Sequence, residues 1–89
     1  MDVNYSISDE AQRELYKASC YFKYIEKEDA FFEDLMNQLR LIQRMPYSFQ
    51  IRYRDVRIVQ LEYFAYTIHY RVFDDGIYIV RLLQQSQDF

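Results

Sequence analysis

The segment YTIHYRVFDDGIYIVRLL, residues 66–83, carries the strongest structural signal in this sequence. Two runs rich in β-branched and aromatic residues flank the dipeptide Asp75-Gly76. This dipeptide favours a two-residue hairpin turn, because such a turn requires positive φ angles. The segment therefore predicts an antiparallel β-hairpin with Asp75 and Gly76 as its loop.

The register of this hairpin assigns its side chains to two faces. We expect the apolar face to pack against helices: it comprises Ile68, Tyr70, Val72, Ile77, Ile79 and Leu83. Arg81 is the exception on that face, and we expect it to pair with a helix acid or to reach solvent. The other face holds Thr67, opposite Gln84, together with His69 and Arg71. We expect this second face to be exposed and to carry any polar chemistry.

Upstream of the hairpin, apolar residues recur with a period of 3.6 and predict two helices. The first stripe runs over residues 11–25, after a cap at Ser8 or Asp9. The second runs over residues 32–42 and ends before Pro46, because the residue before a proline avoids helical angles. The short connection between the stripes makes the two helices an antiparallel hairpin.

Other segments alternate with a period of two and predict strands. These are residues 3–7 and residues 56–64, with residues 49–53 as a weaker, more loop-like candidate. The predicted order is one strand, two helices and then three or four antiparallel strands. This is an α+β fold with the helical hairpin on one face of the sheet. We expect residues 1–89 to form a single domain with one modest core.

Composition excludes several classes of protein. Apolar residues make up 51% of the chain and aromatic residues 19%, with one Gly and one Pro, which excludes disordered and collagen-like chains. No apolar run is long enough to span a bilayer or to form a signal peptide, so we expect a cytoplasmic domain without membrane contact. Cys20 is the only cysteine and cannot form an internal disulfide. Nothing in the sequence points to a metal or a cofactor.

The net charge of −3 is unevenly distributed. Residues 1–39 carry four cations and nine acids, giving −5, whereas residues 40–89 carry seven arginines and five acids, giving +2. Arginine without lysine is typical of fixed, bidentate contacts to carboxylate or phosphate, the alternative being ordinary surface charge. The overall negative charge argues against nucleic-acid binding, because that affinity depends on neutralising phosphates.

Three stretches carry a family resemblance: Asp55–Ile58, Phe64–Val72 and the tail Leu83–Phe89. In order and spacing they resemble the RelE/ParE superfamily of bacterial toxins, from type II toxin–antitoxin and plasmid-stabilisation systems. The resemblance implies a toxin component that is neutralised by a cognate antitoxin protein. It also implies DNA gyrase or the ribosome as the target, with the gyrase-directed ParE branch acting by binding without catalysis.

The sequence departs from the ribonuclease members of this superfamily at three positions. Those members have an arginine at the position of Thr67, and commonly His, Arg or Tyr around the positions of Gln84 and Gln87. Threonine offers no guanidinium to a phosphate, and glutamine cannot donate a proton as a general acid. The comparison therefore implies an emptied catalytic pocket and favours a toxin that is not an enzyme.

Two other functions stay open. A ribonuclease with displaced catalytic groups would use His69 and Arg71, with Arg57 or Glu62 approaching from the neighbouring strand. The simpler interpretation of His69 is a half-buried strand residue. A degenerate, non-toxic member of the superfamily would only bind its antitoxin.

Apolar residues beside the helical stripes predict a protein partner. Phe31, Phe32 and Met36, together with Met45, widen the helical face beyond what one sheet can cover, and leave a groove for an amphipathic helix. Four arginines are expected to receive acidic side chains from the partner's extended segment: Arg52, Arg54, Arg57 and Arg71. The alternative occupant of the apolar surface is a second copy of this chain, in a homodimer.

Overall fold

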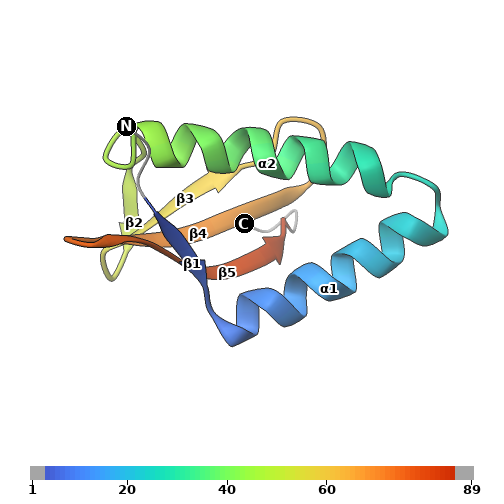
Figure 1. Ribbon diagram of the computed structural model, residues 1–89, viewed down its shortest axis with the longest axis horizontal. Helices are drawn as coiled ribbons and strands as arrows, with labels where there is room; N and C mark the ends of the chain where they lie inside the picture. Colours follow the sequence, from blue (N-terminus) through green and yellow to red (C-terminus); the bar gives the residue numbers. More distant parts are fainter. Residues whose placement is uncertain (1–3, 86–89) are drawn as a thin grey trace.

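The computed structural model describes residues 4–85, whose elements follow the predicted order (Figure 1). The elements are β1 (Tyr5–Ile7), α1 (Asp9–Tyr24), α2 (Glu28–Arg44), β2 (Ile51–Tyr53), β3 (Val56–Gln60), β4 (Tyr66–Phe73) and β5 (Gly76–Gln84). All five strands form one sheet in the order β1-β5-β4-β3-β2. The α+β prediction is confirmed. The sheet is larger than predicted, because β1 joins its edge parallel to β5 and β2 pairs with β3.

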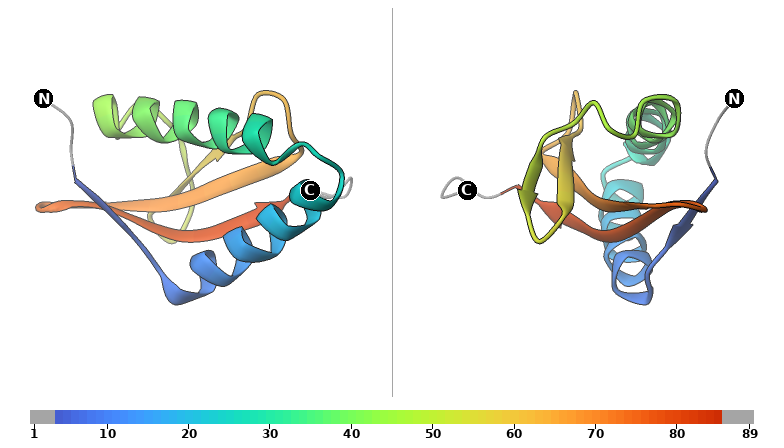
Figure 2. Two further views of the ribbon diagram at one scale, coloured as in Figure 1. Left: turned by 45° about the vertical axis from the view of Figure 1, so that its right-hand side comes forward. Right: turned by 90° about the vertical axis from the view of Figure 1, so that its left-hand side faces the viewer.

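A capping side chain and a proline determine where α1 begins and where α2 ends. Ser8, rather than Asp9, caps α1: its Oγ accepts a hydrogen bond from the Ala11 amide at 3.0 Å. Helix α2 ends at Arg44, two residues before Pro46. The two helices meet at their short connection and splay apart toward their other ends (Figures 1 and 2). This splaying decides the shape of the surface between them.

The core lies between the helices and one face of the sheet. Phe31 of α2 is fully buried and stacks on Phe22 of α1, with ring centroids 4.6 Å apart. Ile68 and Tyr70 of β4 belong to the same buried cluster and have no exposed surface. Burial raises the pKa of Tyr70 to about 12, and its hydroxyl donates to the Pro46 carbonyl at 2.8 Å. Tyr70 therefore ties the segment after α2 to the sheet.

The turn of the β4–β5 hairpin differs from the prediction. Phe73 pairs with Gly76, so the two loop residues are Asp74 and Asp75 rather than Asp75 and Gly76. Gly76 serves another purpose: its φ is +152°, and an added Cβ would lie 2.7 Å from the Asn4 carbonyl oxygen. That oxygen accepts the hydrogen bond from the Ile77 amide at 2.9 Å. The glycine thus allows the chain before β1 to dock on β5.

A β-bulge at Val80 changes the register a second time. As a result Arg81 lies opposite His69, and Leu82 rather than Leu83 enters the core. The prediction that placed Arg81 on the core face is therefore wrong. A one-residue shift moves every following side chain to the other face of a strand.

Ser8, the N-cap residue of α1, and Glu14 of α1 satisfy polar groups of β5 beyond the end of β1. The Ser8 hydroxyl donates to the Val80 carbonyl at 2.8 Å, and the Leu82 amide donates to Glu14 Oε1 at 2.9 Å. Arg81 Nη2 pairs with Glu14 Oε2 at 2.6 Å, so its predicted pairing with a helix acid is confirmed. Burial alone would raise the pKa of Glu14, but hydrogen bonds from Arg81 and Leu82 lower it overall.

Candidate functional site

The face of β4 that carries Thr67 and His69 is closed. Both residues are 2% exposed, so the prediction that this face is open to solvent is wrong. The Tyr53 hydroxyl of β2 lies 3.0 Å from His69 Nδ1, and Thr67 Oγ1 lies 2.9 Å from His69 Nε2. Thr67 Oγ1 also donates to the Leu83 carbonyl at 3.2 Å. A continuous hydrogen-bond chain from Tyr53 to Leu83 therefore occupies this position.

The direction of these hydrogen bonds follows from their acceptors. Because the Thr67 hydroxyl donates to the Leu83 carbonyl, it accepts from His69 Nε2–H, and Nδ1 then accepts from the Tyr53 hydroxyl. A neutral imidazole is thus satisfied at both nitrogens. Burial, and after it the charge of Arg81, lowers the pKa of His69. Near neutral pH the ring offers a substrate neither a free lone pair nor an acidic proton.

The positions that correspond to the ribonuclease pocket do not face one another as predicted. Thr67 pairs with Leu83, and Gln84 pairs with Tyr66. Because neighbouring residues of a strand point to opposite faces, Thr67 and Gln84 lie on opposite sides of the sheet. The displacement of the turn by one residue and the bulge together cause the difference. Gln87, the third predicted position, lies outside the described residues.

Two arginines predicted to assist catalysis are bound to backbone carbonyls. Arg57 donates to the Phe49 carbonyl, and by register it lies on the face of β3 away from His69. Arg71 shares the face of His69, but its Nη2 donates to the Arg54 carbonyl at 2.8 Å. Both arginines therefore brace the segments around β2, and the structure does not gather them around the imidazole.

Asp34 of α2 was not among the predicted site residues, yet it is only 2% exposed. Its carboxylate accepts from the Glu62 amide at 3.1 Å and from the Tyr63 amide at 2.7 Å. These bonds turn the chain after Gln60, where the sequence predicts a strand that continues to Phe64. Glu62, the remaining catalytic candidate, consequently lies on an exposed loop beyond the end of β3. The sequence signal for this contact was an acidic residue on the side of the helix that the apolar stripe predicts to be buried.

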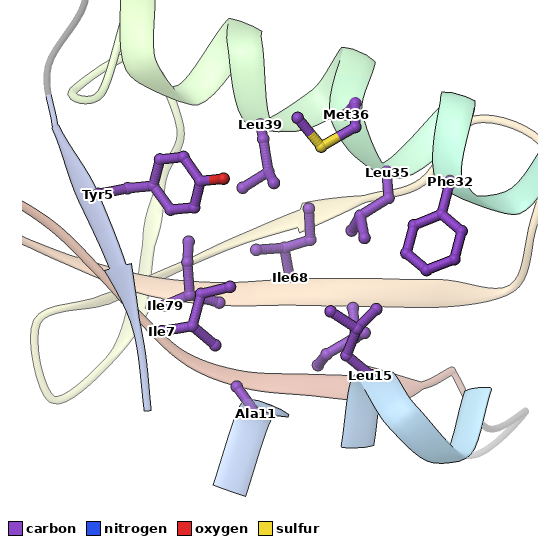
Figure 3. Close-up of a pocket in the computed structure, with 11 residues that line it drawn as sticks. Tyr5, Ile7, Ala11, Leu15, Phe32, Leu35, Met36, Leu39, Ile68 and Ile79 are labelled. Carbon is purple, nitrogen blue, oxygen red and sulfur yellow. The ribbon is translucent and has the colours of Figure 1, made fainter. Parts of the chain in front are cut away.

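An apolar groove lies between α2, α1 and β1 (Figure 3). Eleven residues line it: Tyr5, Ile7, Ala11, Leu15, Phe32, Leu35, Met36, Leu39, Ile68, Ile79 and Leu82. Its volume is about 100 Å³, and Tyr5 is the one lining residue with a polar side-chain group. The groove lies where the helices diverge over the sheet: Ile68, Ile79 and Leu82 of the sheet are buried beneath it, and its exposed lining residues are on α2 and β1.

The apolar residues predicted to bind a partner occupy three kinds of position. Phe32 and Met36 line the groove, and Met36 and Tyr5 are 36% and 38% exposed, so a partner could reach them. Phe31 is fully buried in the core, and its predicted role at the partner surface is therefore wrong. Met45 is 49% exposed but does not line the groove.

The comparison with known families identifies the chain. The model of the family described as "ParE toxin of type II toxin-antitoxin system, parDE" matches residues 5–89. The chain belongs to the ParE toxin family. Its fold is similar to a solved chain described as "Chromosomal ParDE TA system from P. aeruginosa", with a TM-score of 0.79 at 19% identity. The match covers 94% of this chain and 97% of that chain, whereas no curated sequence matches significantly.

In this ParE-family toxin the apolar groove and two arginines are open to a partner, whereas the polar network around His69 is buried. Arg52 and Arg54 are exposed, on β2 and on the turn that follows it, where Arg54 adopts a φ of +44°. Over residues 4–85, neither helix is long and apolar enough to cross a bilayer. In that same part of the chain, no three His, Cys, Asp or Glu side chains are grouped to hold a metal ion.

Proposed function

We propose that this toxin acts by binding a macromolecular target, without catalysis, and that an antitoxin neutralises it by filling the apolar groove. The observation that carries the non-catalytic part is the closed chain Tyr53–His69–Thr67–Leu83. It occupies the place where ribonuclease relatives would require charged, accessible groups.

RNA cleavage through the 2′-hydroxyl requires a base, an acid and positive charge near the developing phosphorane. His69 is buried, neutral and hydrogen-bonded at both nitrogens, and Thr67 brings no positive charge. Arg71 shares their face but is held by a backbone carbonyl. These contacts support a binding mechanism over a ribonuclease with displaced catalytic groups.

The shape and chemistry of the groove support an amphipathic helix as the antitoxin segment. Its walls are apolar, and the partly exposed Met36 gives its rim a flexible side chain that adapts to a partner. Helices bind such grooves through residues at positions i, i+3, i+4 and i+7. Arg52 and Arg54 are exposed nearer the opposite edge of the sheet, available to acidic side chains of an extended antitoxin segment.

DNA gyrase and the ribosome are the targets that the family resemblance implies, and both lie in the bacterial cytoplasm. A net charge of −3 favours a protein target, since docking on ribosomal RNA would bring an acidic chain against a polyanion. We therefore propose a gyrase-like protein target. A homodimer that buries the groove, or a non-toxic binding module, is an outcome of the test below.

The test is controlled expression in a bacterial host, with growth and cellular mRNA followed together. We expect growth arrest without new mRNA ends, and recovery when the product of the neighbouring open reading frame is co-expressed. Translation-dependent mRNA cleavage that is lost in Tyr53→Phe and His69→Ala variants would contradict the binding mechanism. Normal growth together with a stable antitoxin complex would identify the non-toxic module.

A further inference from the structure

The outer face of α1 and the connection after it carry a cluster of positive charge. These cations belong neither to the groove nor to the hydrogen-bond chain around His69. Its cations are exposed and comprise Arg13, Lys17, Lys23 and Lys27. None of the four makes an ion pair with any residue from 4 to 85. Glu14, the one acid between residues 11 and 25, is already paired with Arg81. Between residues 11 and 25, no unpaired acid compensates the charge of Arg13, Lys17 and Lys23.

Three tyrosines lie among these cations. Tyr16, Tyr21 and Tyr24 are 72%, 56% and 86% exposed, respectively. Exposed tyrosines clustered on one helix are a feature of protein interfaces, where a large, stiff side chain contributes contact area at low entropic cost. We call the four cations and these three tyrosines the cationic face of α1.

The fold does not need the cationic face. Helix α1 is held to the core through its opposite side, where Ala11, Ala18 and Phe22 are buried. The groove also lies on that inner side, because its lining residues from α1 are Ala11 and Leu15. A partner on the cationic face and a helix in the groove would therefore contact different sides of α1.

We infer that the cationic face of α1 is the surface that docks on the target, and that the target offers it an acidic protein patch. This inference rests on the proposed function. The rest of the chain carries seven cations and fourteen acids, a net charge of −7. The cationic face therefore differs in sign from the remainder, which supports an acidic occupant. Such a distribution orients the toxin, because the net negative charge of the remainder is repelled by the same acidic patch.

A protein patch fits better than a nucleic acid. The strongly acidic remainder would oppose the long charged path of a nucleic-acid strand, whereas a local patch contacts the cationic face alone. Acids also limit the face: Asp9 and Glu10 precede it, Glu26 lies between Lys23 and Lys27, and Glu28 follows Lys27. The stretch from Arg13 to Lys23, which carries three of the four cations, is therefore short, roughly 15 Å at the rise of an α-helix.

The test compares Lys17→Glu/Lys23→Glu with Arg40→Glu/Arg44→Glu, a control with the same charge change on the exposed side of α2. Growth arrest is titrated at matched protein levels. We expect the α1 variant to require about tenfold more toxin for the same arrest, and the control to resemble the unmodified chain. Antitoxin copurification should stay intact in both variants. Equal potency of the α1 variant and its control would overturn the inference.

Binding to defined polyanions separates this inference from the proposed function. Fluorescence anisotropy near physiological salt uses poly-L-glutamate, a single-stranded oligonucleotide and duplex DNA as probes. If the unmodified chain does not arrest growth, the proposed function fails. Poly-L-glutamate binding that is lost only in the α1 variant would then still support the inference, and its absence would overturn it. Oligonucleotide or duplex binding that depends on Lys17 and Lys23, without poly-L-glutamate binding, would identify a nucleic acid as the occupant instead.

Discussion

The hydrogen-bond chain around His69 makes a quantitative prediction for Thr67→Val. Valine keeps the shape of threonine but removes the hydroxyl that accepts from His69 Nε2 and donates to the Leu83 carbonyl. His69 is 2% exposed, so water cannot easily replace the lost acceptor. Leaving a buried donor unsatisfied costs about 1–3 kcal/mol. We therefore expect the free energy of unfolding to fall by about that amount.

Urea denaturation and thermal melting measure this change. For a domain of this size, each kcal/mol lowers Tm by about 4–8 °C, so we expect a decrease of roughly 4–24 °C. Thr67→Ser keeps the hydroxyl and loses one methyl group, and should cost no more than about 1 kcal/mol. Gln84→Ala, at an exposed position, should change stability by less than about 0.5 kcal/mol. If Thr67→Val were as mild as Gln84→Ala, the closed network would be refuted.

Three further predictions concern other buried or strained positions. Because the pKa of His69 is lowered in the folded chain, the unfolded chain takes up a proton first, and stability should fall as the pH drops from about 6.5, by at most ~1.4 kcal/mol per pH unit. A His69→Phe variant that keeps this slope would contradict the assignment. Gly76→Ala should lower stability by more than about 1 kcal/mol in urea, because its Cβ would meet the Asn4 carbonyl; an unchanged midpoint would disprove the close approach. Asp34→Ala should cost about 1.5–3 kcal/mol by the same assay and expose the Gln60–Tyr66 loop to protease, with Asp34→Asn retaining part of the stability. Equal losses in both Asp34 variants would contradict its role as an acceptor.

Much of the fold could be predicted because its signals are local. The helical stripes, the cap at Ser8, the break before Pro46 and the strand-rich hairpin each depend on residues close in sequence. The bulge at Val80 could not be read in the same way. It is accompanied by contacts of Ser8 and Glu14 with β5, which join distant parts of the chain. That single residue changed the face assigned to Arg81.

The candidate site was harder to predict than the fold. Thr67, His69 and Arg71 alternate as on any exposed strand, and their pattern carries no sign that Tyr53 reaches His69. Burial of polar groups depends on partners supplied by other strands, so alternation alone cannot distinguish a closed network from an open site. The groove was easier to predict, because the excess of apolar residues beside the helical stripes can be read directly from the sequence. Even there, only packing decided that Phe31 enters the core.

The central claim is that the groove between α2, α1 and β1 receives the antitoxin. The most direct measurement is the affinity of the purified toxin for the product of its neighbouring open reading frame, by titration calorimetry, for the unmodified chain, Met36→Glu and Met45→Glu. Met36 lines the groove, whereas Met45 is exposed outside it and serves as the matched control. We predict that Met36→Glu weakens binding by at least about tenfold and that Met45→Glu does not, because only the first places a charge in the apolar contact. Equal affinities for both variants, or an unmodified toxin that stays a homodimer and ignores its neighbour, would contradict the claim.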